Sequence, residues 1–404
     1  MSRVSELWLE RQERGYDCDK SLYVCTDCFD DDGLQGYITR HGQPHGCSFC
    51  QNDGENRSAM RLFDVLEFIL ASIAMEWGRA EDEGLPYETR EGGWQGDVVD
   101  TWDLFNDSLS DELECQHEDL IQEIINSLDD RPWCRRDPYM LPADQIYLNG
   151  WREFSQFIIH SARFVFYKAL EKRNDSLDYD EINPADILDI LGHLAVDLEL
   201  ITKTSANVSL FRSRIMAQDI TLTRAAELGP PPSEFAMMPN RMSPAGIPMF
   251  YGAFDRETTL AETLSGNEPA GNKAICGEFK TTRPLKLLDL TALRTFPSLF
   301  DEDRRHLRNK YAFMYAFRRD FIKPIERTDR AHAEYVPTQV VTEYFRHVFT
   351  TPEGEQLDGI IYPSSKNGKQ AVVLFTDSSR VRDAENRNDQ ECLLYLENVT
   401  ELAC

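Results

Sequence analysis

The sequence has no apolar run long enough to cross a membrane. A membrane-spanning helix needs about 18 or more consecutive apolar residues, and charged residues interrupt every stretch of this 404-residue chain before that length. The first eleven residues carry charges throughout, which argues against a secretory signal. We therefore expect a cytoplasmic protein that has no membrane partner.

Basic residues are also scarce. The chain has 43 Lys and Arg against 70 Asp and Glu, which gives a net charge of −27. Residues 81–130 hold 17 acidic residues and a single basic one, Arg90. Such a surface repels phosphate backbones, so it argues against nucleic-acid binding through the N-terminal half. A solvated helical face with an acidic loop is the simplest explanation, and a basic partner is the alternative.

Internal repeats and low-complexity linkers are absent as well, which excludes a repeat architecture. The length instead predicts two or three domains. Changes in pattern along the chain place the expected domains at 1–57, 58–204 and 205–404.

The ten cysteines do not resemble the disulfide framework of a small secreted protein. Cys25 and Cys28 form one Cys-x-x-Cys pair, and Cys47 and Cys50 form another after 18 intervening residues. Two such pairs complete a tetrahedral four-thiolate site with no open position, which predicts one structural zinc ion in a zinc ribbon over 1–57. We expect residues 37–39 to form a strand of this ribbon.

Other residues near these pairs are weaker candidates. His41 and His45 lie between the pairs and could replace a cysteine, although exposed loop residues are the simpler interpretation. The remaining cysteines have no matching spacing and are expected to be free thiols: Cys18, Cys115, Cys134, Cys276, Cys392 and Cys404.

Helical periodicity dominates residues 58–204. One stripe with the period of a helix consists of Leu62, Val65, Leu66, Ile69 and Ile73. Helical nucleases of the HEPN kind, which cleave RNA without a metal, use an arginine and a histidine separated by four to six residues. Arg152 and His160 have seven residues between them, and Arg327 with His332 fits only in the other half of the chain, where chance explains it. We expect this bundle to be a scaffold or sensing module.

Strands and helices are mixed from residue 205 onward. Strands are expected at 208–215, 247–253, 277–281, 285–290, 357–365 and 370–375, with helices over 311–321 and 335–349. We expect the strand at 277–281 to pair with the strand at 285–290. Because the elements do not follow a regular strand–helix–strand alternation, the fold class is predicted as α+β.

One stretch concentrates chemically useful residues. Arg241 precedes a turn, Tyr251 lies on a short apolar strand, and Glu262 follows on a helix that Asp255 caps. Such a set could hold a phosphate, stack on a ring and stabilise a cation. Alone, each residue also has an ordinary explanation as an ion-paired arginine, a core tyrosine or a surface glutamate.

From about residue 208 to 380 the chain resembles the RES domain family. The resemblance rests on Phe211-Arg212, Asn240-Arg241, Tyr251, Glu262 and the run 358–365. The N-terminal part resembles the zinc-containing HEPN/RES N-terminal domain. The chain differs from compact family members by about 200 additional N-terminal residues and by Asn-Arg-Met-Ser-Pro in place of Gly-Gly-Arg-Trp-Asn.

The resemblance implies an ADP-ribosyltransferase-like fold and a toxin that cleaves the nicotinamide–ribose bond of NAD, with water or phosphate as acceptor. It also implies an antitoxin or regulatory partner in a toxin–antitoxin or antiphage setting, although the N-terminal domains could regulate in cis. The implied roles divide the residues into two groups: Arg241, Glu262 and Ser364 as catalytic, and Arg212, Tyr251 and Ser365 as NAD-binding.

Two other functions are left open by the sequence. One is a transferase that moves ADP-ribose onto a protein. The other is a non-enzymatic, zinc-containing sensor with a degenerate RES domain. The sequence also leaves homo-oligomer formation open.

Overall fold

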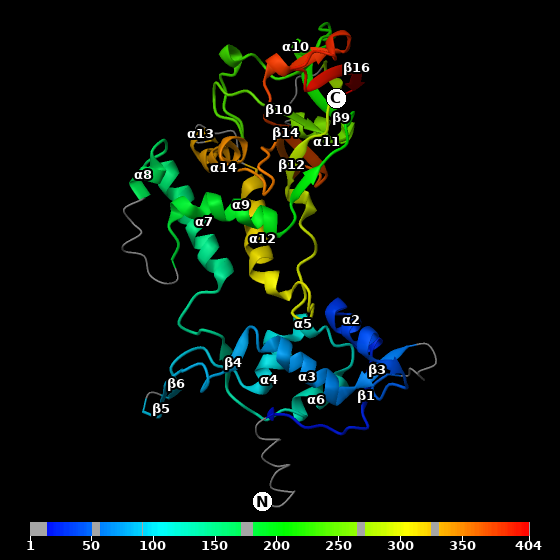
Figure 1. The fold of residues 1–404 in the computed structure, drawn as a ribbon, viewed down its shortest axis with the longest axis vertical. Coiled ribbons are helices and arrows are strands. Elements are labelled where there is room, and N and C mark those ends of the chain that lie inside the picture. Colours follow the sequence, from blue (N-terminus) through cyan, green and yellow to red (C-terminus); the bar gives the residue numbers. More distant parts are fainter. Residues whose placement is uncertain are drawn as a thin grey trace, which may run out of the picture. The chain divides into compact units, whose positions relative to one another are not determined.

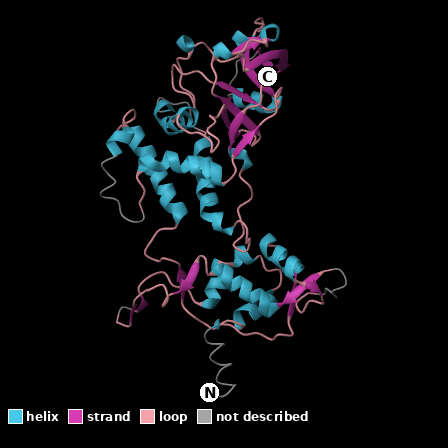
Figure 2. Ribbon diagram, in the orientation of Figure 1, coloured by secondary structure: helices cyan, strands magenta, loops and turns pink. Residues whose placement is uncertain are grey.

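The computed structural model describes residues 14–50, 57–90, 92–170, 181–264, 271–324 and 331–403. They form two compact units, residues 1–142 with 296–309 and residues 143–295 with 310–404. Figure 1 labels the elements, and Figure 2 shows that both units contain helices and strands. Within the described ranges, no helix is both long enough and apolar enough to cross a membrane. The first eleven residues, Arg327, the His332 side chain and Cys404 lie outside the described residues.

The first unit combines small sheets with short helices. Its largest sheet is antiparallel with strand order β1, β3, β2, and β4 pairs with β7 and β5 with β6. The strands are β1 (Tyr23–Cys25), β2 (Gln43–Pro44), β3 (Ser58–Arg61), β4 (Trp77–Arg79), β5 (Tyr87–Glu88), β6 (Gly93–Trp94) and β7 (Trp133–Arg135). The helices are α2 (Asp32–His41), α3 (Leu62–Ile73), α4 (Thr101–Asp103), α5 (Ser110–Leu113) and α6 (Glu118–Asn126).

Helix α3 lies at the centre of the first unit's core because apolar residues occupy most of its positions. Val65, Leu66 and Ile69 are fully buried, and burying a side chain of this size contributes about 1.5–3 kcal/mol. Leu299 and Phe300 belong to the same core, although they come from the segment 296–309 late in the chain. This unit therefore depends on residues from both halves of the sequence.

The segment 296–309 is also held by a buried cation. Arg308 donates from Nε to Glu76 at 2.8 Å and from Nη2 to Glu112 at 2.5 Å, and its Nη1 donates to the Pro297 carbonyl at 2.7 Å. The side chains of Glu76 and Glu112 are 29% and 30% exposed, so both ion pairs are only partly buried. The segment is thus fixed by specific pairing as well as by apolar packing.

The strand expected at residues 37–39 is wrong, because these residues lie within α2. Asp31 caps this helix by accepting a hydrogen bond from the Leu34 amide at 2.7 Å. Leu34 and Ile38 are four residues apart and fully buried, which is the spacing of one helix face. The sheet next to the cysteines is formed instead by β1, β3 and β2, and Cys25 is the last residue of β1.

The second unit is organised around a nine-stranded mixed sheet. The strand order is β15, β16, β11, β9, β10, β14, β13, β12, β8, and only β12–β13 and β15–β16 are parallel. The strands are β8 (Ile201–Lys203), β9 (Ser209–Ala217), β10 (Phe250–Ala253), β11 (Asn272–Thr281), β12 (Lys286–Asp289), β13 (Gly359–Pro363), β14 (Gln370–Leu374), β15 (Val381–Asp383) and β16 (Leu394–Ala403).

The second unit also contains helices, and one of them, α7, precedes the strands of the sheet in the sequence. They are α7 (Ala143–His160), α8 (Phe166–Leu170), α9 (Ile187–Asp197), α10 (Ala225–Leu228), α11 (Arg256–Thr263), α12 (Arg308–Ile322), α13 (Ala331–Glu334) and α14 (Val336–His347). Trp151 of α7 meets Phe317 of α12 edge to face, with ring centroids 5.1 Å apart. Helix α7 also contacts α14 and α9, so it packs with the second unit.

The α+β class is confirmed, and so are the helices around 311–321 and 335–349 and the hairpin of β13 and β14. The expected pairing of 277–281 with 285–290 is wrong, because β11 lies between β16 and β9 whereas β12 lies between β13 and β8. Residues 58–204 contain the expected helices with short strands among them. They are divided between the two units, and the domain limits stay a prediction.

Candidate functional site

The geometry of the second unit centres on a glutamate held by a serine. The Ser364 hydroxyl donates to Glu262 Oε1, which joins the end of α11 to the turn after β13. Ser364 is only 2% exposed, whereas Glu262 is an exposed residue. The buried serine therefore holds the carboxylate, while the glutamate side chain stays accessible to solvent. Ser365 is half-buried on the same turn, but Ser364 makes the contact with the glutamate.

Local hydrogen bonds place the serine turn against the start of α11. The Ser364 amide donates to the Lys369 carbonyl at 2.8 Å, which closes the turn. Asn367 Nδ2 then donates to Thr258 Oγ1 at 3.0 Å. Thr258 in turn donates its amide to the capping residue Asp255 at 2.8 Å. The turn and the helix start are thus tied together, which explains how two residues distant in the sequence meet.

Tyr362, which is buried, and Tyr251, which is half-buried, lie on the same side of the sheet. Ala253 pairs with Ala371, which pairs with Tyr362, and Tyr251 lies two residues before Ala253 on β10. Burial raises the pKa of Tyr251 to about 12. Burial and then the negative charge of Glu262 raise the pKa of Tyr362 above its usual range. Both phenols are therefore neutral at physiological pH and can donate hydrogen bonds.

Arg241 is held at both its backbone and its side chain. Its Nη1 donates to the Ile322 carbonyl at the end of α12, and Thr338 at the start of α14 donates to the Arg241 carbonyl. The Tyr251 hydroxyl shares a 2.9 Å hydrogen bond with Ser243 Oγ in the same segment. Burial dominates the pKa of Tyr251, and the Arg241 charge opposes that rise. Hydrogen bonds of the Tyr251 hydroxyl with Ser243 and with the Met242 amide, which donates to it, thus join the segment that carries Arg241 to β10.

Arg212 lies on β9, and its guanidinium lies next to a ring of β10. It shares a face of β9 with Leu210, as expected, and its Cζ lies 5.7 Å from the Phe250 ring centroid. Because β9 and β10 pair at one position only, Nη1 can donate to the Tyr251 carbonyl at 2.8 Å. Burial lowers the pKa of Arg212 to about 10, and its buried Nε has no partner within the described residues. The guanidinium lies under the β10 backbone, and its side chain leaves the face opposite to Tyr251.

Sequence reasoning gave no role to three residues of this arrangement. Tyr362 lies within the run 358–365, where its alternation with Ile360 indicated only a buried strand position. Ser243 and Thr338 carry no sequence signal, since Thr338 reaches Arg241 across 97 residues of chain. Such contacts depend on the tertiary fold.

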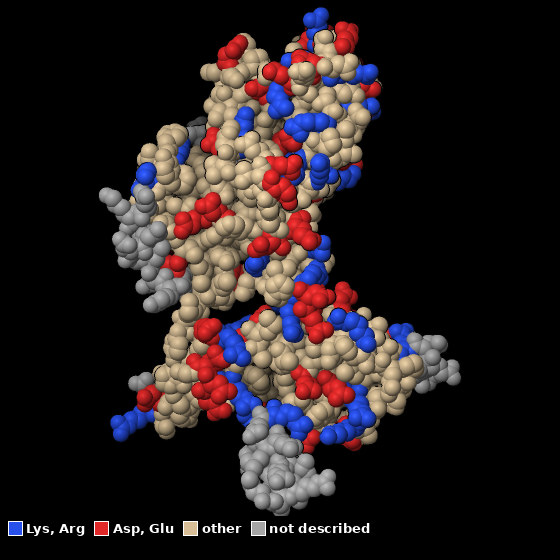
Figure 3. Space-filling view, in the orientation of Figure 1, with Lys and Arg blue, Asp and Glu red and all other residues tan. Residues whose placement is uncertain are grey.

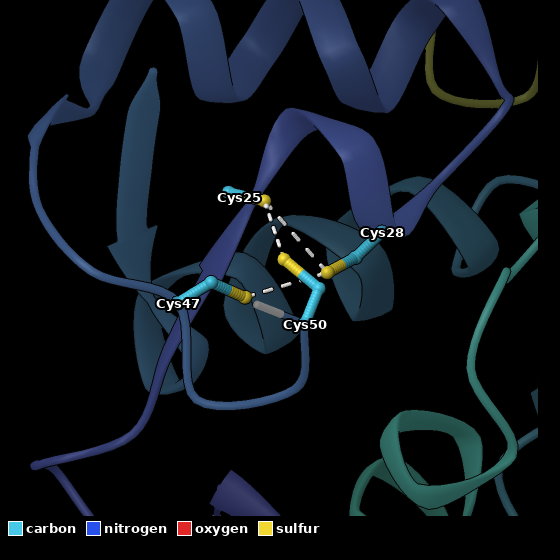
Figure 4. A group of neighbouring side chains, drawn as sticks. All are labelled: Cys25, Cys28, Cys47 and Cys50. Carbon is cyan, nitrogen blue, oxygen red and sulfur yellow. Dashed lines mark hydrogen bonds between the residues drawn. The ribbon is translucent and has the colours of Figure 1, made fainter. Parts of the chain in front are cut away.

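The four predicted cysteines of the first unit come together (Figure 4). All four sulfur atoms lie within 4.8 Å of one another, and neighbouring pairs are separated by 3.4, 3.5 and 3.9 Å. A tetrahedral zinc ion with Zn–S bonds of about 2.3 Å requires sulfur separations of roughly 3.8 Å. The residues therefore fit a four-coordinate metal.

The second cysteine pair is fixed next to the first by the backbone. The Ser48 amide donates to the Tyr23 carbonyl at 2.8 Å, and the Tyr23 amide donates to Ser48 Oγ at 3.0 Å. The hydrogen bond with Cys28 lowers the pKa of the Cys47 thiol, which favours the thiolate that a metal binds. His45 stacks on Tyr23 with ring centroids 3.7 Å apart and is not part of the sulfur cluster.

Acidic side chains are spread over the first unit, where Figure 3 shows them interspersed with basic ones. Several acids of the 81–130 stretch pair with arginines from outside it. These pairs are Glu83 with Arg136, Glu112 with Arg308 and Asp129 with Arg131. Internal pairing thus accounts for part of the acidic excess, and a basic partner stays a prediction.

Two family models match parts of this chain. The RES domain family matches residues 214–395, and HEPN/RES N-terminal domain 1 matches residues 40–172. None of the curated proteins that were compared matches. A solved structure, the M. tuberculosis MbcT-MbcA toxin-antitoxin complex, is similar at 14% identity over 53% of this chain and 92% of that chain, with a TM-score of 0.28 that does not establish a common fold. The family matches show that this chain contains a RES domain and a HEPN/RES N-terminal domain 1.

Proposed function

We propose that the RES domain cleaves the nicotinamide–ribose bond of NAD, with Glu262 as the central catalytic residue. The observation that carries this proposal is the exposed Glu262 carboxylate, which buried Ser364 holds next to Tyr362. The resemblance to RES toxins supplies the substrate. The chemistry of this bond then gives each side chain a role.

Breaking the bond needs stabilisation of positive charge more than proton transfer. The electron pair of the C–N bond leaves with nicotinamide, which departs as a neutral molecule, so no general acid is required. The ribose becomes cationic at its anomeric carbon, and a fixed carboxylate beside it lowers the barrier. Water or phosphate then forms the new C–O bond, and water gives up its proton to solvent. The Ser364 hydroxyl keeps the Glu262 carboxylate in one orientation for this step.

The remaining residues would bind and orient NAD. The planar guanidinium of Arg241 suits two oxygens of the pyrophosphate, and the neutral Tyr362 phenol can donate to a ribose hydroxyl. Tyr251 fixes the Arg241 segment through Ser243, and its predicted stacking on nicotinamide stays a prediction. The predicted NAD contacts of Arg212 and Ser365 also stay predictions.

We also propose one structural zinc ion at Cys25, Cys28, Cys47 and Cys50. The four thiolates would complete its coordination sphere, so the ion would link β1 to the second cysteine turn without taking part in catalysis. A partner protein that controls the enzyme, as the family resemblance implies, is part of the same proposal.

The deciding experiment incubates the full chain with NAD, with and without phosphate, and identifies the products by mass. Free ADP-ribose or its phosphate ester supports cleavage. Glu262→Gln should lower kcat by about 10²–10³-fold, whereas Glu257→Gln on the exposed face of the same helix should not. Label transferred from NAD to protein would favour the transferase, and undiminished NAD at high protein concentration would favour the non-enzymatic sensor.

The toxin proposal has its own test in cells. Expression of the chain should deplete cellular NAD and stop growth, and the Glu262→Gln variant expressed to the same level should do neither. Growth arrest by the variant would separate toxicity from NAD cleavage and overturn this part of the proposal.

A further inference from the structure

A pocket of about 400 Å³ in the first unit is lined by four arginines. They are Arg14, Arg79, Arg131 and Arg136, whereas the whole stretch 14–142 has only ten Lys and Arg residues. Small-molecule sites usually have volumes of about 300–1,000 Å³. The pocket therefore combines the size of a ligand site with a concentration of positive charge that the acidic composition of this unit does not predict.

Three carboxylates also line the pocket, and two of them are already paired. Asp129 accepts a hydrogen bond from Arg131 Nη2 at 3.0 Å, and Glu83 accepts one from Arg136 Nη1 at 3.1 Å. The third, Asp82, is exposed and lies on the turn after β4. These pairs leave two of the four arginines without a carboxylate partner among the described residues.

Arg79 is the most informative of these two arginines, because it is half-buried and makes no hydrogen bond or ion pair with any described residue. A guanidinium that is partly removed from water is costly unless an anion accepts from it. Its partner across the β4–β7 pair is Trp133, and opposite residues of an antiparallel pair have their side chains on the same face. Trp133 is half-buried, and its Nε1 donates to Thr101 Oγ1 at 3.1 Å, which fixes the ring. The cation thus lies beside a fixed aromatic side chain.

Gly15 shows how close two of the guanidinium groups are to each other. Its φ is +80°, and a Cβ atom at this position would lie 2.8 Å from Arg79 Nη2 and 3.9 Å from Arg131 Nη2. The two nitrogens are therefore no more than 6.7 Å apart. Because hydrogen bonds between charged groups are about 2.7–2.9 Å long, the oxygens of one phosphate group can accept from both nitrogens.

We propose that this pocket binds a small molecule through a phosphate group, and that the ligand is a mononucleotide. Arg79 and Arg131 would donate to the phosphate, while Trp133, which also lines the pocket, would offer aromatic surface to the base. The proposal is independent of NAD cleavage, because all of these residues lie outside the RES domain. The first unit then has a ligand of its own, as a sensing module needs.

The test is calorimetric titration of AMP into the full chain at constant ionic strength. Arg79→Gln should weaken AMP binding roughly tenfold or more. Arg79→Lys keeps the charge without the planar fork and should weaken binding less. Arg61→Gln is the matched control, since it removes an exposed arginine of the same unit that does not line the pocket, and it should bind AMP normally. Thermal melting checks that each variant folds.

Inorganic phosphate is the second probe and separates recognition of the phosphate from recognition of the base. Binding of both probes that Arg79→Gln weakens, with AMP bound more tightly than phosphate, supports the proposal. If the folded Arg79→Gln protein binds AMP as tightly as the unaltered chain does, the pocket is overturned, and AMP bound at the RES domain would give this result. Failure of the unaltered chain to bind AMP also overturns it, whatever the outcome of the NAD cleavage assay.

Discussion

Replacing Ser364 with alanine tests the link between the glutamate and its support. The substitution removes one hydroxyl that donates to a carboxylate and leaves Glu262 in place. Hydrogen bonds to charged groups contribute about 1.5–3 kcal/mol, and about 1.4 kcal/mol corresponds to a factor of ten in rate. If this hydrogen bond orients the carboxylate in the transition state, kcat should fall roughly 10–150-fold.

The assay is steady-state NAD consumption, which separates kcat from KM. Because Ser364 does not extend toward solvent, its loss should leave KM nearly unchanged. Ser365→Ala is the informative comparison, since Ser365 lies on the same turn. If Ser365 binds ribose, its loss should raise KM with little change in kcat.

Stability must be measured alongside activity. The Ser364 backbone hydrogen bond to Lys369 stays intact in the alanine variant, so the melting temperature should fall by only a few degrees. A folded Ser364→Ala protein with kcat within a factor of two of the original would refute the assigned role. The glutamate would then act without the serine.

Two further predictions concern the metal and the tyrosines. A chelator or the Cys47→Ser substitution should unfold the first unit, because a structural zinc ion contributes about 10–16 kcal/mol to folding. Cys18→Ser is the control and should leave the unit folded. Metal analysis should give one zinc ion per chain. Burial raises the pKa of the Tyr251 phenol from 10 to about 12 in the folded protein. The contribution of the neutral phenol to folding stability is therefore complete below pH 10 and is lost as the pH rises toward 12. Urea unfolding at pH 10 and at pH 12 should show that Tyr251→Phe loses less folding stability over this window than the original protein does, by at most roughly 3 kcal/mol. Equal losses would contradict a phenol that stays neutral in the folded protein.

Local signals in the sequence predicted the parts of the molecule that depend on local interactions. The spacing of the cysteine pairs predicted that their four sulfur atoms come together. Pro337 correctly marks the first turn of α14, where a missing amide hydrogen has no cost. The face of β9 that carries Arg212 also followed from strand alternation.

The features that depend on long-range packing could not be predicted from the sequence. Alternation along β9 shows which residues share a face with Arg212. It does not show whether Glu262 lies on the same side of the sheet, because this depends on the strand order. Residues 37–39 have the β-branched and aromatic composition of a strand. The Asp31 cap and the burial of Ile38 make them helical. Helical periodicity likewise predicted α7 but not the unit with which it packs.

The packing of α7 leads to a prediction about where the chain can be divided. Trp151, Phe154 and Ile158 of this helix are almost completely buried, with Trp151 against Phe317. At about 1.5–3 kcal/mol for each buried side chain, removing these three alone costs roughly 5–9 kcal/mol, comparable with the total stability of a domain. A fragment of residues 205–404 should therefore fail to fold, whereas residues 143–404 should give a cooperative unit.

Both fragments contain the segment 296–309 but lack the first-unit residues that bury it. Because both fragments lose this packing equally, any difference between them comes from residues 143–204. The measurements are soluble yield, thermal melting and NAD cleavage. A soluble 205–404 fragment that melts as cooperatively as 143–404 would show that α7 is dispensable for folding. Aggregation of 205–404 beside an active 143–404 would instead place the functional boundary near residue 143, within the segment matched by HEPN/RES N-terminal domain 1.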